Sequence, residues 1–399
     1  MHKAKTGFVA MAVAALALAP ALSLAQDKVT VGHIGDMSSL YSDIDGKGGS
    51  SAIQMAIDDF GGKVLGKPIE LLTADHLNKA DVAAAKAREW VDLRGLNLLI
   101  SGSNSGAALA VARVAAEKKL VNINTAAATP ALTNEQCNPY TIHYVYDSVA
   151  LAKTTAANIV AQGGRNWYFL TADYSGGLSL EESAAEVVKA SGGTVLGRVK
   201  HPLNASDFSS FLLQAQNSRA QVLGLANAGG DTVNAIKAAK EFGITKNMKL
   251  VATLAFLTDV HSIGLRNAEG LLLTTSWYWD GDEASRKFAQ RFFAKMKRMP
   301  TDVQAGGYSA TMTYLKAVAA AKTTDPDKVM EQLKKTPIDD FYAKGYIRAD
   351  GRFVHDMHLA QVKSPAESKK PWDYLTIRKT MRGEDAFTTK AESKCALWK

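Results

Sequence analysis

Beyond its first 25 residues the sequence has no apolar run long enough to cross a bilayer, which predicts a soluble protein. It also has no basic tract and no strip that interleaves basic and aromatic residues, although it carries 47 Lys and Arg against 39 Asp and Glu. Because the excess of positive charge is spread along the chain, a nucleic acid is not the expected partner.

No motif in the sequence predicts catalysis. There is no GxSxG nucleophile elbow, and no carboxylate pair stands out as general acid and base. Residues 61–67 (GGKVLGK) resemble a phosphate-binding loop, but Pro68 stands where a Ser or Thr would bind Mg²⁺. His355 and His358 have a spacing that suits a metal, but on a hairpin their side chains point to opposite faces. We therefore expect neither an enzyme nor a bound cofactor or metal.

The first residues predict export. Lys3 and Lys5 give a charged start, residues 7–19 are apolar, and Ser23-Leu24-Ala25 fits a small-x-small cleavage site. The residue directly after that site is Gln26 and not a cysteine, so a lipid anchor is not expected. We predict a signal peptide of residues 1–25 that is cleaved after Ala25, and a periplasmic mature protein.

Cysteine is scarce as well, with Cys137 and Cys395 as the two in the chain. In an oxidising compartment two cysteines pair more often than they stay free. A Cys137–Cys395 disulfide would tie the end of the chain to a segment in its first half.

Strands and helices alternate through the first half of the chain. Strands are predicted at 28–36, 69–75, 96–102 and 120–125, and helices at 50–60, at 81–93 with Asp81 as its N-cap, and from about 107. The glycines at 46, 48 and 49 are expected in tight turns. This alternation predicts a parallel α/β sheet.

The same alternation restarts in the second half. Strands are predicted at 167–173, 194–200, 221–228, 249–255 and 270–277, with helices at 148–162, 178–190, 207–216 and 231–242. GGKVLG at 61–66 is echoed by GGTVLG at 192–197, and each follows a helix and leads into a strand. Two related lobes are therefore expected.

After Trp277 the pattern changes. Helices are predicted at 283–299, 307–321 and 325–334, and a hairpin at 345–363 with Asp350-Gly351 as its turn. The polar tail beyond the hairpin is expected to be irregular.

Two loops rich in small residues follow neighbouring strands of the first half. They are residues 101–106 (SGSNSG) and residues 125–129 (TAAAT), the latter followed by Pro130 in the first position of a helical turn. Open α/β folds bind ligands at the carboxyl ends of such strands. Free N–H groups and hydroxyls there suit a carboxylate or another small anion. The alternative is ordinary helix capping by Ser and Thr.

Aromatic residues mark the second half. Tyr174 follows its first strand, which places it opposite the two loops if the lobes face each other. In Trp277-Tyr278-Trp279 the two tryptophans would share one face of a strand. That face could line a cleft, or the rings could pack around a hinge.

The chain resembles the periplasmic solute-binding proteins of ABC importers, in the branch that binds branched-chain amino acids. The resemblance covers essentially the whole mature chain. It rests on the order and spacing of VTVGHIGDMSS, NSGAALAVA, NTAAATPALT, Asp173-Tyr174-x-x-Gly177 and DFSSFLLQAQ. It implies a monomer of two Rossmann-like lobes, joined by three crossing strands, that closes on a solute and serves a permease in the inner membrane. The lobes would comprise 26–147 plus 277–356, and 148–276 plus 357–399.

The resemblance also implies a set of site residues. Ser105 and the backbone at Ala126 and Ala128 would hold the carboxylate of the solute, and Tyr174 would stack on it. The full set expected to contact the solute is Asp36, Tyr41, Ser103, Asn104, Ser105, Thr125, Ala126, Ala128, Thr129, Tyr174, Asn227 and Phe256.

In one place the chain departs from the family. Amino-acid binders of this branch carry an acidic residue in the second lobe that holds the ammonium group of the solute, but residues 253–256 (TLAF) contain none. A buried ammonium without a partner is costly, which favours a carboxylate with an apolar or aromatic body. Asp36, Asp45 or Asp231 could still supply the charge, so an aliphatic amino acid stays open. A sensory module for a membrane receptor and an exported hydrolase are the alternative functions.

Overall fold

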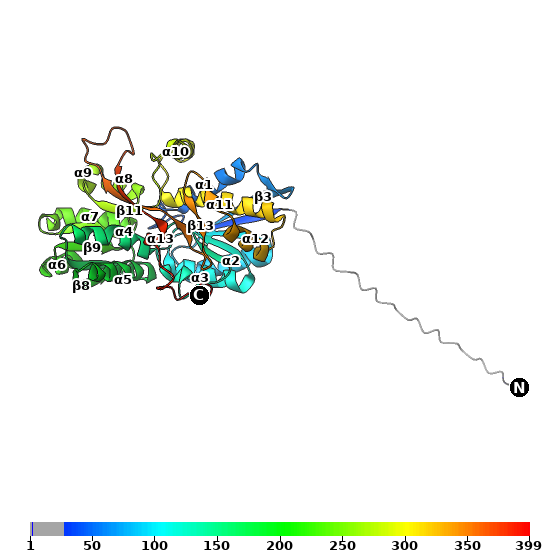
Figure 1. Ribbon diagram of the computed structural model, residues 1–399, viewed down its shortest axis with the longest axis horizontal. Helices are drawn as coiled ribbons and strands as arrows, with labels where there is room; N and C mark the ends of the chain where they lie inside the picture. Colours follow the sequence, from blue (N-terminus) through cyan, green and yellow to red (C-terminus); the bar gives the residue numbers. More distant parts are fainter. Residues whose placement is uncertain (1, 3–27) are drawn as a thin grey trace.

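A computed structural model describes residues 2 and 28–399 of the chain (Figure 1). The predicted signal peptide and its cleavage site lie outside the described residues. Across the described part, no helix combines the length and apolar character needed to span a membrane.

The first lobe is built on a six-stranded sheet with the order β2-β3-β1-β4-β5-β6. Its strands are parallel except β2, which forms a short hairpin with β3. The strands are β1 (Val29–Gly35), β2 (Lys63–Val64), β3 (Lys67–Asp75), β4 (Leu96–Ser101), β5 (Val121–Asn124) and β6 (Thr141–His143). Every residue of β1 and β5 is buried, as expected for parallel strands covered on both faces.

Helices from two parts of the chain cover this sheet. α2 (Ala80–Arg94) packs on α3 (Ser105–Lys118), and α1 (Gly46–Asp59) packs on α11 (Asp302–Ala321). The lobe also contains the turn η1 (Pro130–Thr133), α10 (Glu283–Met296), α12 (Pro326–Lys335), and a small sheet of β12 (Ile338–Asp339), β13 (Lys344–Ile347) and β14 (Phe353–His355).

The second lobe repeats this plan with a parallel four-stranded sheet in the order β10-β9-β7-β8. Its strands are β7 (Asn166–Ala172), β8 (Thr194–His201), β9 (Val222–Ala226) and β10 (Lys249–Ala252). Its helices are α4 (Ser148–Ala161), α5 (Ser175–Ala190), α6 (Ser209–Asn217), α7 (Gly230–Glu241), η2 (Ile244–Lys246), α8 (Leu257–Ile263) and α9 (Leu265–Ala268). Figure 1 shows the two lobes side by side, which confirms the predicted two-lobed α/β fold.

An antiparallel sheet of β11 (Leu272–Thr275), β15 (Met357–Val362) and β16 (Leu375–Met381) packs beside α4. Within residues 28–399 the chain passes between the lobes after β6, after β11 and after β14, and the segment after β16 returns to the first lobe. The predicted hairpin at 345–363 is confirmed in its first part, as β13–β14 with Gly351 at φ 88° in its turn. Its second part was wrong, because residues 357–362 form β15 in the sheet with β11 and β16. The expectation of an irregular tail was wrong, because β16 extends the sheet and the short helix α13 (Gly383–Ala386) follows it.

Two local predictions were also wrong. Asp81 is not the N-cap of α2, since the helix starts at Ala80 and Asp81 lies in its first turn. The glycines at 46, 48 and 49 form the first turn of α1 instead of tight turns. The reason is close packing, since a Cβ at Gly48 would overlap the amide of Gln304 and one at Gly49 would lie 2.9 Å from the His33 ring.

Candidate functional site

The two small-residue loops of the first lobe lie next to each other, as predicted. β4 and β5 are parallel neighbours, and Ser101 is paired with Asn124 where both strands end. The amide of Asn124 donates to the carbonyl oxygens of Ser101 and Gly102, each at 3.1 Å, and so holds one loop against the other. The loops therefore form one continuous surface at the carboxyl edge of the sheet.

Backbone amides converge on this surface around the Ser105 hydroxyl. Ser105 begins α3, and its Oγ accepts hydrogen bonds from the N–H groups of Ala128 and Thr129, both at 3.2 Å. Asn104 caps the same helix by accepting from Ala107 N at 3.1 Å. A helix N-terminus carries partial positive charge, so two amides, a hydroxyl and a helix end together suit an anionic group.

Asp45 supports the first loop from behind. Its carboxylate accepts from Ser103 N at 2.6 Å, from Ser103 Oγ at 3.1 Å and from Gly46 N at 2.8 Å. Burial raises the pKa of this carboxyl. A Cβ at Gly102 would overlap its Oδ2 atom, which explains the glycine there. With its oxygens held by the loop and by α1, Asp45 is a structural residue of the site.

The carboxylate of Asp36 is likewise hydrogen-bonded by the residues around it, most of them in its own loop. Its carboxylate accepts from the backbone of Ser39 and Tyr41, both at 2.8 Å, and from the Asn78 amide at 2.7 Å. Burial would raise the pKa of Asp36, but these hydrogen bonds outweigh it and lower the pKa. Asp36 therefore shapes the loop that carries Tyr41.

That loop touches the second lobe directly. Tyr41 Oη donates to Tyr174 Oη at 2.9 Å, and the two ring centroids lie 6.3 Å apart. Beside them, Gly230 N donates to the Leu40 carbonyl at 3.3 Å. Burial raises the pKa of Tyr174 to about 12, so its hydroxyl stays neutral near pH 7. The structure thus brings Asp36, Tyr41 and Tyr174 together with the lobes in contact.

Phe256 of the second lobe contacts Tyr146, which in turn bonds the first lobe and which the sequence analysis did not predict. Tyr146 lies on the first passage between the lobes, its ring centroid is 6.0 Å from that of Phe256, and its hydroxyl donates to the Ala126 carbonyl at 2.8 Å. Tyr146 has no local motif to single it out. Only its place directly after β6 could have done so.

Asn227 and Asp231 make their hydrogen bonds inside the second lobe. The Asn227 amide contacts the ring of His201 at 3.1 Å and accepts from the Thr232 hydroxyl at 2.7 Å. The Asp231 carboxylate accepts from the backbone of residues 204 and 205, both at 3.1 Å, and burial raises its pKa.

Asp259 is a second residue that sequence reasoning missed. It lies three residues beyond the segment TLAF and is 4 % exposed, and its Oδ2 accepts from Phe256 N at 2.9 Å. Burial raises its pKa to about 7. A cavity of about 490 Å³ between the lobes is lined by first-lobe and second-lobe residues, among them Ser38, Ser42, Asp43, Asn204, Gly229 and Asp259.

The tryptophans after β11 pack at the hinge. β11 ends at Thr275, so they do not share one face of a strand as predicted. Trp277 Nε1 donates to Ser285 Oγ at 2.9 Å, and its ring lies edge-on to Phe288 and Phe341. Trp279 Nε1 donates to the Trp372 carbonyl at 2.9 Å.

The paired histidines do not form a metal site. His355 lies on β14 and His358 on β15, and His355 Nε2 contacts the Val145 carbonyl at 2.8 Å. Throughout the described ranges, no group of three or more His, Cys, Asp or Glu is arranged to hold a metal ion.

The predicted disulfide is present. Cys137, in the loop after η1, is bonded to Cys395 near the end of the chain, with their Cα atoms 5.7 Å apart.

Comparison with known proteins agrees with this architecture. Two crystal structures from Burkholderia are similar along nearly their whole length. A periplasmic binding protein from Burkholderia mallei is 66% identical, with a TM-score of 0.93 over 94% of this chain and 100% of that one. A branched-chain amino-acid ABC transporter periplasmic ligand-binding protein from Burkholderia xenovorans is 41% identical, with a TM-score of 0.83 over 93% and 100%.

More distant relatives extend the comparison. The Leu/Ile/Val-binding protein homolog 6 of Brucella melitensis is 26% identical over 72% of this chain and 73% of its own length. The same fold, at 22% identity and a TM-score of 0.80 over 90% of this chain and 98% of the other, occurs in an ABC-transporter solute-binding protein from Rhodopseudomonas palustris in complex with 3,4-dihydroxybenzoic acid.

These relatives are solute-binding proteins and not enzymes, as expected for this chain. Families of this kind work outside the cytoplasm with ABC transporter permeases. The family model described as periplasmic binding protein matches residues 28–370. The chain therefore belongs to the periplasmic binding protein family, in the branched-chain amino-acid ABC transporter group.

Proposed function

We propose that this protein captures a small carboxylate-bearing solute between its two lobes and delivers it to the permease of an ABC importer. The converging amides of Ala128 and Thr129 around Ser105 carry this proposal, because they offer a carboxylate a positive helix end and several donors. The first turn of α3 also faces the second lobe, since a Cβ at Gly106 would lie 3.5 Å from Ser175 Oγ. A solute bound there would touch both lobes and favour the closed arrangement.

The body of the solute is proposed to be apolar or aromatic. Aromatic rings from both lobes, Tyr41, Tyr146, Tyr174 and Phe256, gather at the same interlobe boundary. Rings of this kind bury large apolar areas and stack on planar groups.

The carboxylates around the cleft favour a solute without an ammonium group. Asp36, Asp45 and Asp231 each accept at least two hydrogen bonds from the protein itself. Asp259 has its pKa raised to about 7 by burial, so with no cation bound much of it is neutral at neutral pH, and an ammonium group would first have to restore its charge. We therefore favour an aromatic or apolar carboxylate over an aliphatic amino acid.

A thermal-shift panel tests the class of solute. Benzoate, 4-hydroxybenzoate, isovalerate, leucine and isoleucine are each added to the purified protein, since binding to the folded state raises Tm by mass action. We expect the plain acids to raise Tm. If leucine or isoleucine raises it and the acids do not, the solute is an amino acid and a carboxylate of the cleft holds its ammonium group.

Replacing the central hydroxyl tests the site itself. Ser105→Ala should weaken binding of the best acid in the panel by about 2 kcal/mol, or roughly thirtyfold, the value of a hydrogen bond to a charged group. Ser183→Ala is the matched control, because it removes a buried serine hydroxyl whose partner is the Ser148 hydroxyl, at 2.8 Å, and not an amide of the two loops. Unchanged affinity in Ser105→Ala, measured by calorimetry, would remove Ser105 from the site.

Delivery is tested with the permease. Membrane vesicles that hold the cognate permease and its ATPase should take up the labelled acid only when the protein is added. A receptor-coupled sensor would bind the same acid without supporting uptake.

A further inference from the structure

The end of the chain returns from the second lobe to the first. We refer to residues 382–399 as the C-terminal strap. It follows β16, which pairs with β15 beside α4, and it reaches the first lobe, where Cys395 is bonded to Cys137. Figure 1 shows the C-terminus at the boundary between the two lobes.

The beginning of the strap is held by the second lobe. Lys153 of α4 donates through Nζ to the Phe387 carbonyl at 3.3 Å, and the same atom lies 3.4 Å from the Glu392 carboxylate. Just before the strap, Thr154 Oγ1 lies 3.7 Å from Met381 Sδ. α13, at the start of the strap, packs against α4.

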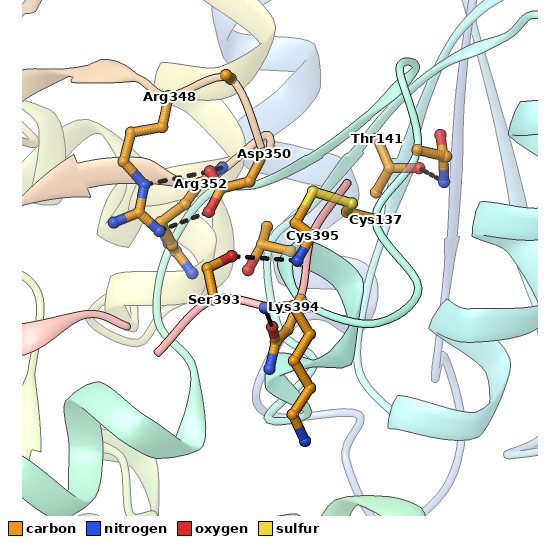
Figure 2. Close-up of a disulfide and its surroundings, with 12 residues drawn as sticks. Cys137, Thr141, Arg348, Asp350, Arg352, Ser393, Lys394 and Cys395 are labelled. Atoms are coloured by element: carbon orange, nitrogen blue, oxygen red, sulfur yellow. Dashed lines mark hydrogen bonds and ion pairs between the residues drawn. A yellow bond between two sulfur atoms is a disulfide. The ribbon is translucent and has the colours of Figure 1, made fainter. Parts of the chain in front are cut away.

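Apart from Glu392, the rest of the strap is held by the first lobe (Figure 2). Next to the disulfide, Lys394 N donates to Asn134 Oδ1 at 2.5 Å. Arg348 of the first lobe donates to the Thr388 carbonyl at 2.8 Å, and its guanidinium lies 3.8 Å from the ring centroid of Trp398. Such a stack of a cation on an aromatic face is attractive.

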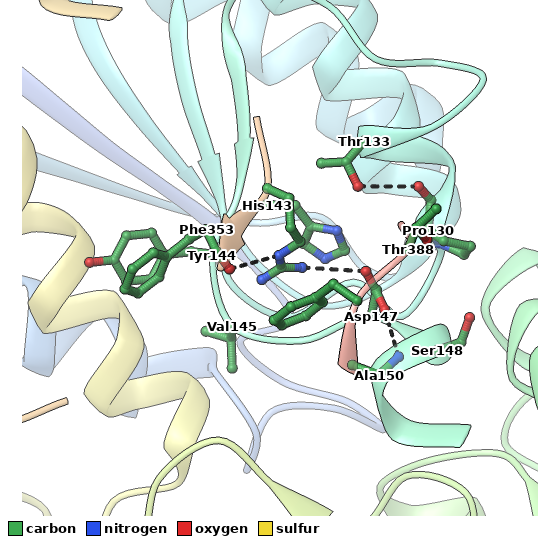
Figure 3. A network of polar contacts seen from close by, with 12 residues as sticks. Pro130, Thr133, His143, Tyr144, Val145, Asp147, Ser148, Ala150, Phe353 and Thr388 are labelled. Carbon is green, nitrogen blue, oxygen red and sulfur yellow. Dashed lines mark hydrogen bonds and ion pairs between the residues drawn. The ribbon is translucent and has the colours of Figure 1, made fainter. Parts of the chain in front are cut away.

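Between these two anchors the strap packs on the hinge, and Figure 3 draws Thr388 of the strap together with His143, Val145 and Asp147 of the first passage. The Phe387 ring lies 4.2 Å from the guanidinium of Arg352, which is fully buried, and 5.5 Å from the ring of His355. Arg352 pairs with Asp147 at 3.7 Å, and Asp147 caps α4 by accepting from Ala150 N at 2.9 Å. The strap therefore packs directly on Arg352 and His355, where the chain passes between the lobes after β14, and through Arg352 on Asp147 at the passage after β6.

Arg352 shows how tightly the hinge is enclosed. Among the described residues its Nη1 and Nη2 atoms have no hydrogen-bond partner, and neither has Nδ1 of the adjacent His143. Separating a buried cation with so few partners from its remaining neighbours costs free energy, so we expect these neighbours to move with it. The face of Phe387 is one of these neighbours, so movement of the hinge is coupled to movement of the strap.

We infer that the C-terminal strap limits how far the two lobes open. Hinge motion concentrates dihedral changes in a few residues where the chain passes between the domains. Here the C-terminal strap is a further connection across the same hinge, and it is held at both ends. A disulfide between two cysteines that are 258 residues apart in the sequence closes it. An unliganded molecule with this connection stays nearer to the closed arrangement. A larger fraction of molecules is then competent to bind, and this raises the apparent affinity for the solute. The inference rests on the proposed closure of the lobes, but not on the identity of the solute.

The test measures opening in the unliganded full chain. Fluorescent labels are placed through unnatural amino acids at Leu93 in α2 and Leu213 in α6, which are 76% and 57% exposed on opposite lobes. Single-molecule energy transfer then compares the wild type with the double variant Cys137→Ser, Cys395→Ser. Leu397→Ala is the matched control, because it alters an exposed strap residue beyond the disulfide. We expect the double variant to shift toward longer distances and the control to match the wild type.

Two further readings decide the outcome. The wild type treated with a phosphine reductant should reproduce the shift of the double variant, and near-ultraviolet circular dichroism should stay native in both. An unchanged distance distribution with an intact fold would overturn the inference. Loss of the native dichroism on removing the bond would also overturn it, because the strap would then serve the stability of the fold. Failure to bind any acid of the panel would count against the proposed solute and leave this result unaffected.

Discussion

The first lobe approaches the cleft with backbone amides and small hydroxyls, whereas the second approaches it with an aromatic ring and a buried acid. On the first lobe Ser105 sits among amides of the neighbouring loop. On the second lobe Tyr174 and Asp259 hold the corresponding positions near the interlobe boundary. Main-chain donors can bind the carboxylate of any solute and do not distinguish one solute from another. Side chains such as Tyr174 and Asp259 are where solutes of different bodies can be distinguished.

The two lobes also differ in how their buried acids are supported. Asp45 accepts three hydrogen bonds from the loop and helix around it, while Asp259 accepts one from Phe256 N. Burial raises the pKa of both carboxyls. Asp45 is thus a rigid support for the anion-binding loop, and Asp259 is an acid whose charge changes near neutral pH.

The largest expected effect tests that rigidity. In Gly102→Ala the new Cβ would overlap Asp45 Oδ2, so either the loop or the carboxylate must move. Overpacking of a tight site costs up to about 3 kcal/mol, and we expect a loss of this size in denaturant unfolding. Gly106→Ala is the control, because the nearest atom to its new Cβ would lie 3.3 Å away, which asks for a much smaller adjustment. Equal stability of the two variants would show that the first-lobe loop adapts, and the contrast between the lobes would fail.

A smaller effect tests the acid of the second lobe. The unfolded chain releases the Asp259 proton near the ordinary aspartate pKa of 3.8, and the folded chain keeps it until about pH 7. The folded state therefore binds more protons between these values, and its stability falls as pH rises through that window. Asp259→Asn keeps an oxygen for Phe256 N but has no charge. Its free energy of unfolding, relative to that of the wild type, should therefore rise by on the order of 2 kcal/mol between about pH 5 and about pH 8.

The control for this slope is an exposed acid of the same lobe. Hydrogen bonds from Ser209 lower the pKa of Asp207, so it is ionised in both folded and unfolded chains throughout that range. Asp207→Asn should leave the slope of unfolding free energy against pH unchanged. A wild-type slope that survives in Asp259→Asn would assign the pH dependence to another buried acid such as Asp45.

The contrast between the lobes also explains what could be predicted from the sequence. The loops of the first lobe follow short buried strands and contain their own helix caps, so local pattern predicts both loops at neighbouring strand ends, although α3 begins at Ser105 and not near residue 107. Asp45 is 58 residues from Ser103 in sequence, and only the packing of α1 on the sheet brings them together. Asp259 lies in a helix of seven residues, which is too short for a periodic pattern of apolar residues to predict it. Likewise β16 is an exposed edge strand, and its pairing with β15 depends on the tertiary fold.

The smallest expected effect lies where the lobes meet. Tyr174→Phe keeps the ring but removes the hydroxyl bonded to Tyr41 at 2.9 Å. A neutral hydrogen bond contributes about 1 kcal/mol, so affinity for the best acid of the panel should fall about fivefold. Tyr41→Phe should have the same effect and the double variant no more, because both remove one bond. Tyr168→Phe, on a half-buried tyrosine of β7, is the control. If Tyr174→Phe weakens binding far more than Tyr41→Phe, the Tyr174 hydroxyl binds the solute itself, and the second lobe contributes a polar contact as well as an aromatic ring.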